Sequence, residues 1–175
     1  MLRVLGVDPG SRVTGYGIVD EGEDKLSSPV WGVIQPSRDS AIQVRLDHIH
    51  SHLLCIIDDW SPECVAIEEP FVGKNPRTIF ALGQAQAIVL LAGAQRGLPI
   101  FRYAPAQTKR AVADYGNATK DQVNDMVRLM LGLGVEIPYQ DASDALAVAL
   151  CHLQHLRYES VLDREIAQQL KEARR

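Results

Sequence analysis

The sequence predicts an α/β fold built on a mixed sheet, with its first three strands antiparallel and with helices on both faces. Short apolar segments near the start of the chain are joined by polar turns, which is typical of an antiparallel meander. Further along, short apolar segments alternate with longer segments of helical periodicity, which is typical of strands joined by helical crossovers. A chain of 175 residues suits one domain with a full core.

The elements follow in order along the chain. Strands are expected over residues 2–8, 13–20 and 29–35. The later elements are a helix from Asp39 to Asp59, a buried strand over 64–69, a helix from Pro76 to Arg96, a strand over 99–104, a helix from Pro105 to Tyr115, a helix capped by Thr119 that reaches Leu131, and a core helix from Asp141 to Tyr158.

Two units are expected. Residues 1–158 form the predicted domain. The segment 159–175 has four acids, four bases and apolar residues at helical spacing, so it either docks as an amphipathic helix or frays. We expect a partly ordered, dispensable tail.

The composition, 46% hydrophobic and 23% charged, is that of an ordinary globular protein. No apolar run is expected to span a bilayer, and no cleavable signal pattern is found, so we expect a cytoplasmic protein without a membrane partner. Cys55, Cys64 and Cys151 lie in apolar stretches without CxxC spacing, which indicates reduced core cysteines.

The net charge of −4 is distributed unevenly. Residues 70–130 hold eight basic and three acidic residues, a local charge of +5 that leaves −9 for the rest of the chain. A local basic face can bind phosphates even on an acidic protein, although a solvated mixed surface is the alternative. The basic residues are Lys74, Arg77, Arg96, Arg102, Lys109, Arg110, Lys120 and Arg128.

Several acidic residues stand where regular elements begin or end: Asp8, Glu68, Glu69, Asp141 and Asp144. If the strand of Glu68 lies beside the first strand, Asp8 and Glu68 project from neighbouring C-terminal ends, where active sites of open sheets gather. Asp141 and Asp144, spaced by three, share one face of a helix.

Such a cluster would be strongly repulsive unless cations neutralised it. Carboxylate oxygens favour Mg²⁺ or Mn²⁺, and two such ions can support phosphodiester hydrolysis. Each acid also has a structural alternative. Asp8 could bond to turn amides, and Asp141 and Asp144 could be helix N-terminal acids favoured by the dipole.

Five motifs in order and spacing carry a family resemblance. They are GVDPGSRVTGYG, AIEEPFVGKNP, LGQAQA, the stretch from Gln107 through KRAVADYGNATKDQVNDMVRLML, and DASDALAVAL. Together they cover about residues 2–155 and resemble the RuvC family of Holliday junction resolvases.

The resemblance implies an RNase H-like fold with a five-stranded mixed sheet flanked by helices. It also implies a homodimeric, Mg²⁺-dependent endonuclease, with two ions per site, that nicks two opposing strands of a four-way DNA junction in recombination and repair. The RuvA and RuvB branch-migration proteins are implied partners. The family's catalytic and metal-binding acids map onto Asp8, Glu68, Asp141 and Asp144, while Glu69 and Pro70 depart from the commonest pattern.

Basic and aromatic residues carry over as well. Lys109 and Lys120 match lysines placed near the scissile phosphate; we expect Lys120 to act in the chemistry and Lys109 to position DNA. Phe71 is either a lid on the core or a surface for stacking an unpaired base, and the resemblance favours stacking. The remaining expected DNA contacts are Lys74, Asn75, Arg77 and Arg110.

The helix containing LGQAQAIVLLAGAQ is rich in small residues and packs on the sheet, on a partner subunit, or on both. A two-fold dimer would present one site to each of two strands of a nearly two-fold junction.

Three other functions are alternatives to a resolvase. An RNA-processing nuclease of the same superfamily would lack the EPFVGKNP loop and the two lysines. A junction-binding protein that does not cut would be expected to have lost acids. An actin-like ATPase would need a second domain, for which 175 residues leave no room.

Overall fold

The computed structural model describes residues 1–69, 75–114, 116 and 118–172, with side chains described up to residue 163. Within these residues one sheet is formed by β1 (Leu2–Asp8), β2 (Thr14–Glu21), β3 (Leu26–Ile34), β4 (Cys64–Glu68) and β5 (Ile100–Tyr103). The strand order is β3-β2-β1-β4-β5. The first three strands pair antiparallel, and β4 and β5 run parallel to β1. The predicted mixed sheet is confirmed.

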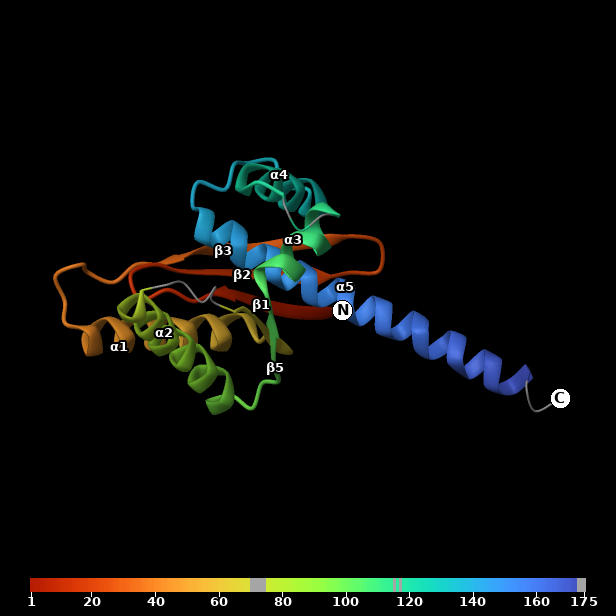
Figure 1. Cartoon of the computed structure of the whole chain (residues 1–175), viewed down its shortest axis with the longest axis horizontal. Helices are drawn as coiled ribbons and strands as arrows, with labels where there is room; N and C mark the ends of the chain where they lie inside the picture. Colours follow the sequence, from red (N-terminus) through yellow and green to blue (C-terminus); the bar gives the residue numbers. More distant parts are fainter. Residues whose placement is uncertain (70–74, 115, 117, 173–175) are drawn as a thin grey trace.

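Helices cover both faces of this sheet, as predicted (Figure 1). On one face lie α1 (Ile42–Trp60) and α2 (Pro76–Gln95), and on the other lie α3 (Pro105–Ala113), α4 (Lys120–Leu131) and α5 (Gln140–Glu172). Two starts follow from local chemistry. Asn75 Oδ1 accepts a hydrogen bond from the Arg77 amide at 3.0 Å, which caps α2. Thr119 and Gln122 form a capping box at the start of α4.

The central strand β1 is buried on both sides, so its side chains alternate between two cores. Val4 belongs to the core under α5, whereas Leu5 and Val7 belong to the core under α1 and α2. A Cβ on Gly6 would lie 1.9 Å from the carbonyl oxygen of Ala145. The backbone of α5 therefore rests directly on β1, which no larger residue at position 6 would allow.

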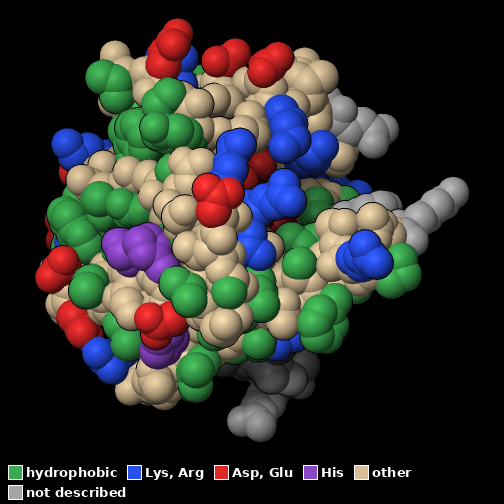
Figure 2. All heavy atoms as spheres, turned by 90° about the vertical axis from the view of Figure 1, so that its left-hand side faces the viewer, with side chains coloured by type: hydrophobic (Ala, Val, Ile, Leu, Met, Phe, Trp, Pro, Cys, Tyr) green, Lys and Arg blue, Asp and Glu red, His purple; other side chains and the backbone are tan. Residues whose placement is uncertain are grey.

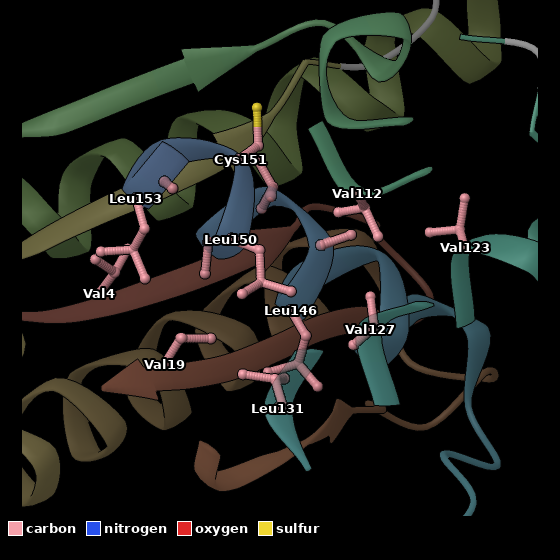
Figure 3. Close-up of a cluster of buried hydrophobic side chains, with 14 of the residues drawn as sticks. Val4, Val19, Val112, Val123, Val127, Leu131, Leu146, Leu150, Cys151 and Leu153 are labelled. Carbon is pink, nitrogen blue, oxygen red and sulfur yellow. The ribbon is translucent and has the colours of Figure 1, made fainter. Parts of the chain in front are cut away.

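The core under α5 holds the first half of that helix in place (Figure 3). Leu146 and Leu150 of α5 share one buried cluster with Val127 and Leu131 of α4 and with Val19 of β2. Burying one such side chain contributes about 1.5–3 kcal/mol. This packing fixes the position of the first turn of α5.

The end of α5 differs from the expectation. The sequence predicted a core helix that ends near Tyr158, but α5 continues without a break to Glu172 and extends away from the body of the molecule (Figure 1). Residues 159–172 contain neither glycine nor proline, so nothing in that segment stops the helix. Side chains 159–163 are exposed, so this part of the helix does not dock on the sheet.

Helix α2 is long and apolar enough to cross a membrane, so the expectation that no apolar run reaches that length is wrong. Length and composition are weak evidence for a membrane span, because Val89 and Ala92 pack into the core against α1 and the sheet. Only 22% of the most apolar part of α2 is buried within the chain. The helix therefore presents an apolar face outward.

The cysteines divide between core and surface. Cys64 and Cys151 are buried, and burial raises the pKa of each thiol to about 11. Cys55 is exposed, which corrects the expectation that all three lie in the core. Leu53 and Ile57 face the core from α1, and Cys55 lies between them on the opposite face of the helix.

Candidate active site

Asp8 and Glu68 lie side by side at one edge of the sheet. The strands β1 and β4 are parallel, with Val7 paired to Ile67, so the two acids occupy the next position on each strand. Both line a cavity of about 350 Å³. This is the arrangement expected if the two strands were neighbours, at the carboxyl ends where open sheets place their ligands.

The turn after β1 does not depend on Asp8. Thr14 Oγ1 donates to the carbonyl of Gly10 at 2.7 Å and accepts from the Gly10 amide at 3.3 Å. Among the described residues, the Asp8 carboxylate forms no hydrogen bond to the turn amides. The turn is therefore held by Thr14, and the alternative role of Asp8 in bonding to turn amides is not observed among the described residues.

The first turn of α5 brings Asp144 to the same cavity. It comes close because β2 has glycine at position 15, where a Cβ would lie 1.8 Å from the carbonyl oxygen of Asp141. Gln140 Nε2 donates to Asp144 Oδ1 at 2.9 Å, and Lys120 Nζ lies 3.7 Å from Asp144 Oδ2. The sheet edge, α5 and α4 thus meet around one cavity.

Burial and mutual repulsion disfavour the charged forms of these acids. The pKa of Asp8 rises to about 7, first because the group is buried and then because of the charges of Asp144 and Asp141. The pKa of Glu68 rises to about 8 by burial and by the charges of Asp8 and Asp144. Burial also raises the pKa of Asp144, against the lowering effects of its hydrogen bond from Gln140 and of the Lys120 charge.

This donor set fits a divalent cation in type and in charge. Oxygen ligands of negative charge are what Mg²⁺ and Mn²⁺ prefer, and a cation would offset the repulsion that raises the pKa of Asp8 and of Glu68. Across the part of the chain that the structure describes, no three His, Cys, Asp or Glu side chains already stand at ligand spacing. The described carboxylates would have to converge to hold one ion together.

Asp141 faces a different cavity from the one that its predicted partners share. It lines an adjoining cavity of about 600 Å³ together with Arg12, Arg45 and Arg77. Its charge still acts on Asp8 and raises the pKa of that group. The structure thus places three of the four predicted acids in one cavity and the fourth within electrostatic reach of it.

The predicted basic residues are distributed around the site. Lys109 and Lys120 line the cavity of Asp8, Glu68 and Asp144, which we call the carboxylate cavity. The charges of both lysines lower the pKa of Glu68. Arg110 lines a separate cavity of about 380 Å³ between α3 and α5. Glu69 also lines the carboxylate cavity beside Glu68.

The predicted DNA contacts around the loop after β4 are only partly described. Arg77 lines the cavity of Asp141, and the side chain of Asn75 caps α2. Phe71 and Lys74 lie outside the described residues. The roles of all four in binding DNA stay predictions.

The end of the molecule where β1 terminates and α5 begins faces the viewer in Figure 2. Lys and Arg side chains gather near the middle of this face, around a hollow in which Asp and Glu atoms are visible. Positive charge gathered beside recessed acidic side chains suits a polyanion.

Comparison with known proteins identifies the family. Residues 4–152 match the family described as Crossover junction endodeoxyribonuclease RuvC. The chain belongs to the RuvC family. A relative bearing that same description, from Dehalococcoides mccartyi, is 43% identical over 162 residues, which cover 92% of this chain and 96% of the relative.

Solved structures agree with the RuvC assignment. The structure of Thermus thermophilus RuvC in complex with a Holliday junction substrate matches with a TM-score of 0.85 and 34% identity, covering 91% of this chain and 97% of that one. A yeast mitochondrial Holliday junction resolvase matches with a TM-score of 0.61 at 16% identity, covering 86% and 78%. At that identity the yeast protein supports the fold alone. The predicted RNase H-like architecture is confirmed by the RuvC structures.

Two residues of this RuvC-family site were missed by sequence reasoning. Arg12 and Arg45 line the cavity beside the carboxylates, yet Arg12 lies in a turn and Arg45 on a helix whose pattern indicated only packing. Arg12 follows Asp8 within the GVDPGSRVTGYG motif, so its proximity could have been inferred. No signal in the sequence places Arg45 beside it.

Proposed function

We propose that this chain is a metal-dependent endonuclease that resolves four-way DNA (Holliday) junctions by hydrolysing two opposing strands in paired, symmetric nicks. Its role is in homologous recombination and DNA repair. The observation that carries the proposal is the shared cavity of Asp8, Glu68 and Asp144 at the carboxyl edge of the sheet, flanked by Lys120, in a chain of the RuvC family.

Asp8, Glu68, Asp141 and Asp144 are the residues that would hold metal. The chemistry supplied by bound Mg²⁺ would be activation of the attacking water and stabilisation of the leaving oxygen. We expect two ions per site, with Mn²⁺ as a substitute. The protein's own contribution is to fix these carboxylates on rigid elements, two at strand ends and two in the first turn of α5.

The two lysines act on the phosphate. Lys120 lies within 3.7 Å of Asp144 yet is 68% exposed, so its charge faces both the carboxylates and the cavity. In that position it offsets negative charge that grows on the phosphate in the transition state. Lys109, on the same cavity wall, holds and orients the strand.

We propose further that the active form is a homodimer assembled through α2. Exposed residues recur along one face of this helix at Phe80, Gly83, Ala87, Leu91 and Ala94. Phe80 is 69% exposed and Leu91 is 46% exposed, and no described residue lies within 4 Å of a Cβ built on Gly83. Small residues between large apolar ones suit close packing against a second copy of the same helix.

A dimer matches the substrate because a two-fold assembly presents one active site to each of two equivalent strands. The branch-migration proteins RuvA and RuvB would act on the same junction, and the cytoplasm of a bacterium is where such DNA is found. Family membership is what supports these partners and this location.

The test uses a synthetic mobile four-way junction and a linear duplex of matched sequence, each with Mg²⁺ or with chelator. Paired symmetric nicks in the junction alone, and only with metal, are expected. Tight junction binding without cutting in Mg²⁺ or Mn²⁺ would overturn the proposal in favour of a binding module. Cutting of a structured RNA in preference to the junction would overturn it in favour of an RNA-processing nuclease.

A further inference from the structure

A second cavity adjoins the carboxylates and gathers positive charge from three separate elements. The cavity has a volume of about 600 Å³. It is lined by Arg12 from the turn after β1, Arg45 from α1 and Arg77 from the first turn of α2. Leu82 lines both this cavity and the carboxylate cavity, so the two are neighbours. Asp141 is the acidic residue on its wall. We call Arg12, Arg45 and Arg77 the arginine pocket.

The arginines of this pocket lack the close carboxylate partners that some other arginines of the chain have. Arg3, Arg96 and Arg157 each form an ion pair at 2.6 Å. Within the described part of the chain, no ion pair involves an arginine of the pocket, and Nε of Arg45 is buried without a hydrogen-bond partner. Three guanidinium groups outnumber the one carboxylate, Asp141, that lines this cavity, which favours an anion there.

We propose that the arginine pocket binds a backbone phosphate of the DNA strand being cut, one or two nucleotides from the scissile bond. This inference rests on the proposed function. A strand carries a phosphate at every nucleotide, and the two cavities share Leu82, so a strand with one phosphate among the carboxylates has a neighbouring phosphate for the pocket to bind. Guanidinium groups bind phosphate through paired hydrogen bonds, which fixes position as well as charge.

The pocket therefore sets the register of the strand. Phosphate contacts orient nucleic acid on a protein, and a second anchored phosphate limits how the scissile phosphate can move. Arg12, Arg45 and Arg77 are positioning residues in this account, because they do not touch the reacting phosphate. Their loss should weaken binding and reduce cleavage through misplacement of the strand.

The first test measures junction binding by fluorescence anisotropy in chelator, over a range of salt concentrations. Arg12→Gln and Arg45→Gln should each weaken binding by about tenfold and reduce the salt slope by about one phosphate contact. Arg157→Gln is the matched control. It removes the same charge beside Glu21, at the end of the sheet opposite Asp8, and should change neither quantity by a comparable amount.

A second test locates the phosphate. Junctions are made with a single uncharged methylphosphonate at each position flanking the cut. The wild-type protein should lose affinity when one particular flanking phosphate is neutral, whereas Arg45→Gln should be insensitive to neutralisation there and remain sensitive elsewhere. Arg45→Lys should recover part of the affinity, because it keeps the charge but loses the paired hydrogen bonds.

The outcomes separate this inference from the proposed function. If the wild-type protein cuts junctions but Arg12→Gln and Arg45→Gln bind with wild-type affinity and salt slope, the arginine pocket is not a phosphate site. If the wild-type protein cuts no junction, the proposed function fails whatever the arginines do. Arg12 is exposed in a turn, so its variant tests the proposal even if Arg45→Gln disturbs folding.

Discussion

Single residues at the sheet edge make the stability of the folded chain depend on pH when no metal is bound. Asp8 holds a proton more tightly in the folded chain, where its pKa is about 7, than it would in water, where a value near 3.8 applies. Burial is the first cause and the neighbouring carboxylates are the second. Ionising this group in the folded state therefore costs stability, and Glu68 adds to the same effect.

The sign of this effect gives a prediction for Asp8→Asn. The raised pKa of Asp8 adds stability that is fully present at pH values below the ordinary pKa of 3.8. This stability is lost as the pH rises through about 7. In chelator, Asp8→Asn should melt higher than the wild-type protein, and the difference should be larger at pH 8 than at pH 4. At about 1.4 kcal/mol per pKa unit the effect is at most about 4 kcal/mol, or on the order of 10 °C.

Differential scanning calorimetry at the two pH values measures this difference. Asp121→Asn is a suitable control, since Asp121 is an exposed acid in the first turn of α4 and does not line the carboxylate cavity. A melting difference for Asp8→Asn that is the same at pH 4 and pH 8 would contradict the account of Asp8 as a buried carboxylate held under repulsion.

At the scale of elements, the approach of α5 to the sheet decides where Asp141 and Asp144 lie. A methyl group on Gly15 would meet the carbonyl oxygen of Asp141 at 1.8 Å, so Gly15→Ala must displace the first turn of α5. We expect a loss of about 1–3 kcal/mol in stability and a larger loss of cleavage than of junction binding. Gly134→Ala is the matched control, because no atom of the described part of the chain lies within 4 Å of its added methyl group.

Melting temperature, junction affinity and single-turnover cleavage of the two glycine variants are compared with the wild type. If Gly15→Ala cleaves as fast as Gly134→Ala, the close contact between β2 and α5 does not position the site.

The outer part of α5 gives an element-scale prediction about domain organisation. We propose that residues 1–158 form the resolvase domain and that 159–175 is a dispensable tail. Side chains 159–163 are exposed, so truncation after Tyr158 removes no core contact made by them. The truncated protein should melt within a few degrees of the full chain and should cut junctions at a similar rate. A large loss of either property would assign the tail to the fold or to the activity.

Many of the helices and strands can be predicted from the local sequence. Short apolar segments bounded by polar turns locate β1 and β2, and the Thr119–Gln122 capping box marks the start of α4. The pairing of Asp8 with Glu68 also follows, once parallel strands are inferred. The end of α5 does not follow, because charged helix-forming residues with apolar residues at helical spacing indicate equally a docked amphipathic helix or a frayed tail.

The division of the site into two cavities cannot be predicted from the local sequence pattern. Spacing by three predicted that Asp141 and Asp144 share a helix face, but the cavity that each one lines depends on what stands opposite. Arg12, Arg45 and Arg77 come together only because a turn, α1 and α2 meet at one end of the sheet. Exposure of Cys55 likewise depends on which face of α1 packs on the sheet.

At the scale of the whole molecule, the apolar outer face of α2 predicts self-association. Ala87 lies at the middle of the exposed face, so Ala87→Glu should place two like charges at the centre of a two-fold interface and yield a monomer. Sedimentation velocity compares it with Leu129→Glu, which adds the same charge at an exposed position of α4. A wild-type protein that sediments as a monomer at micromolar concentration, or an Ala87→Glu variant that stays dimeric, would rule out this interface.

The central claim is that the carboxylates at the sheet edge cut junction DNA, and Asp8→Asn tests it most directly. The measurement is single-turnover cleavage of a mobile four-way junction in Mg²⁺ by the wild-type protein, Asp8→Asn and Asp121→Asn, with junction affinity determined in parallel. We predict paired nicks by the wild type and by Asp121→Asn. Asp8→Asn should bind the junction but cut it slower by a factor on the order of 10³. Cleavage by Asp8→Asn at the wild-type rate would contradict the account.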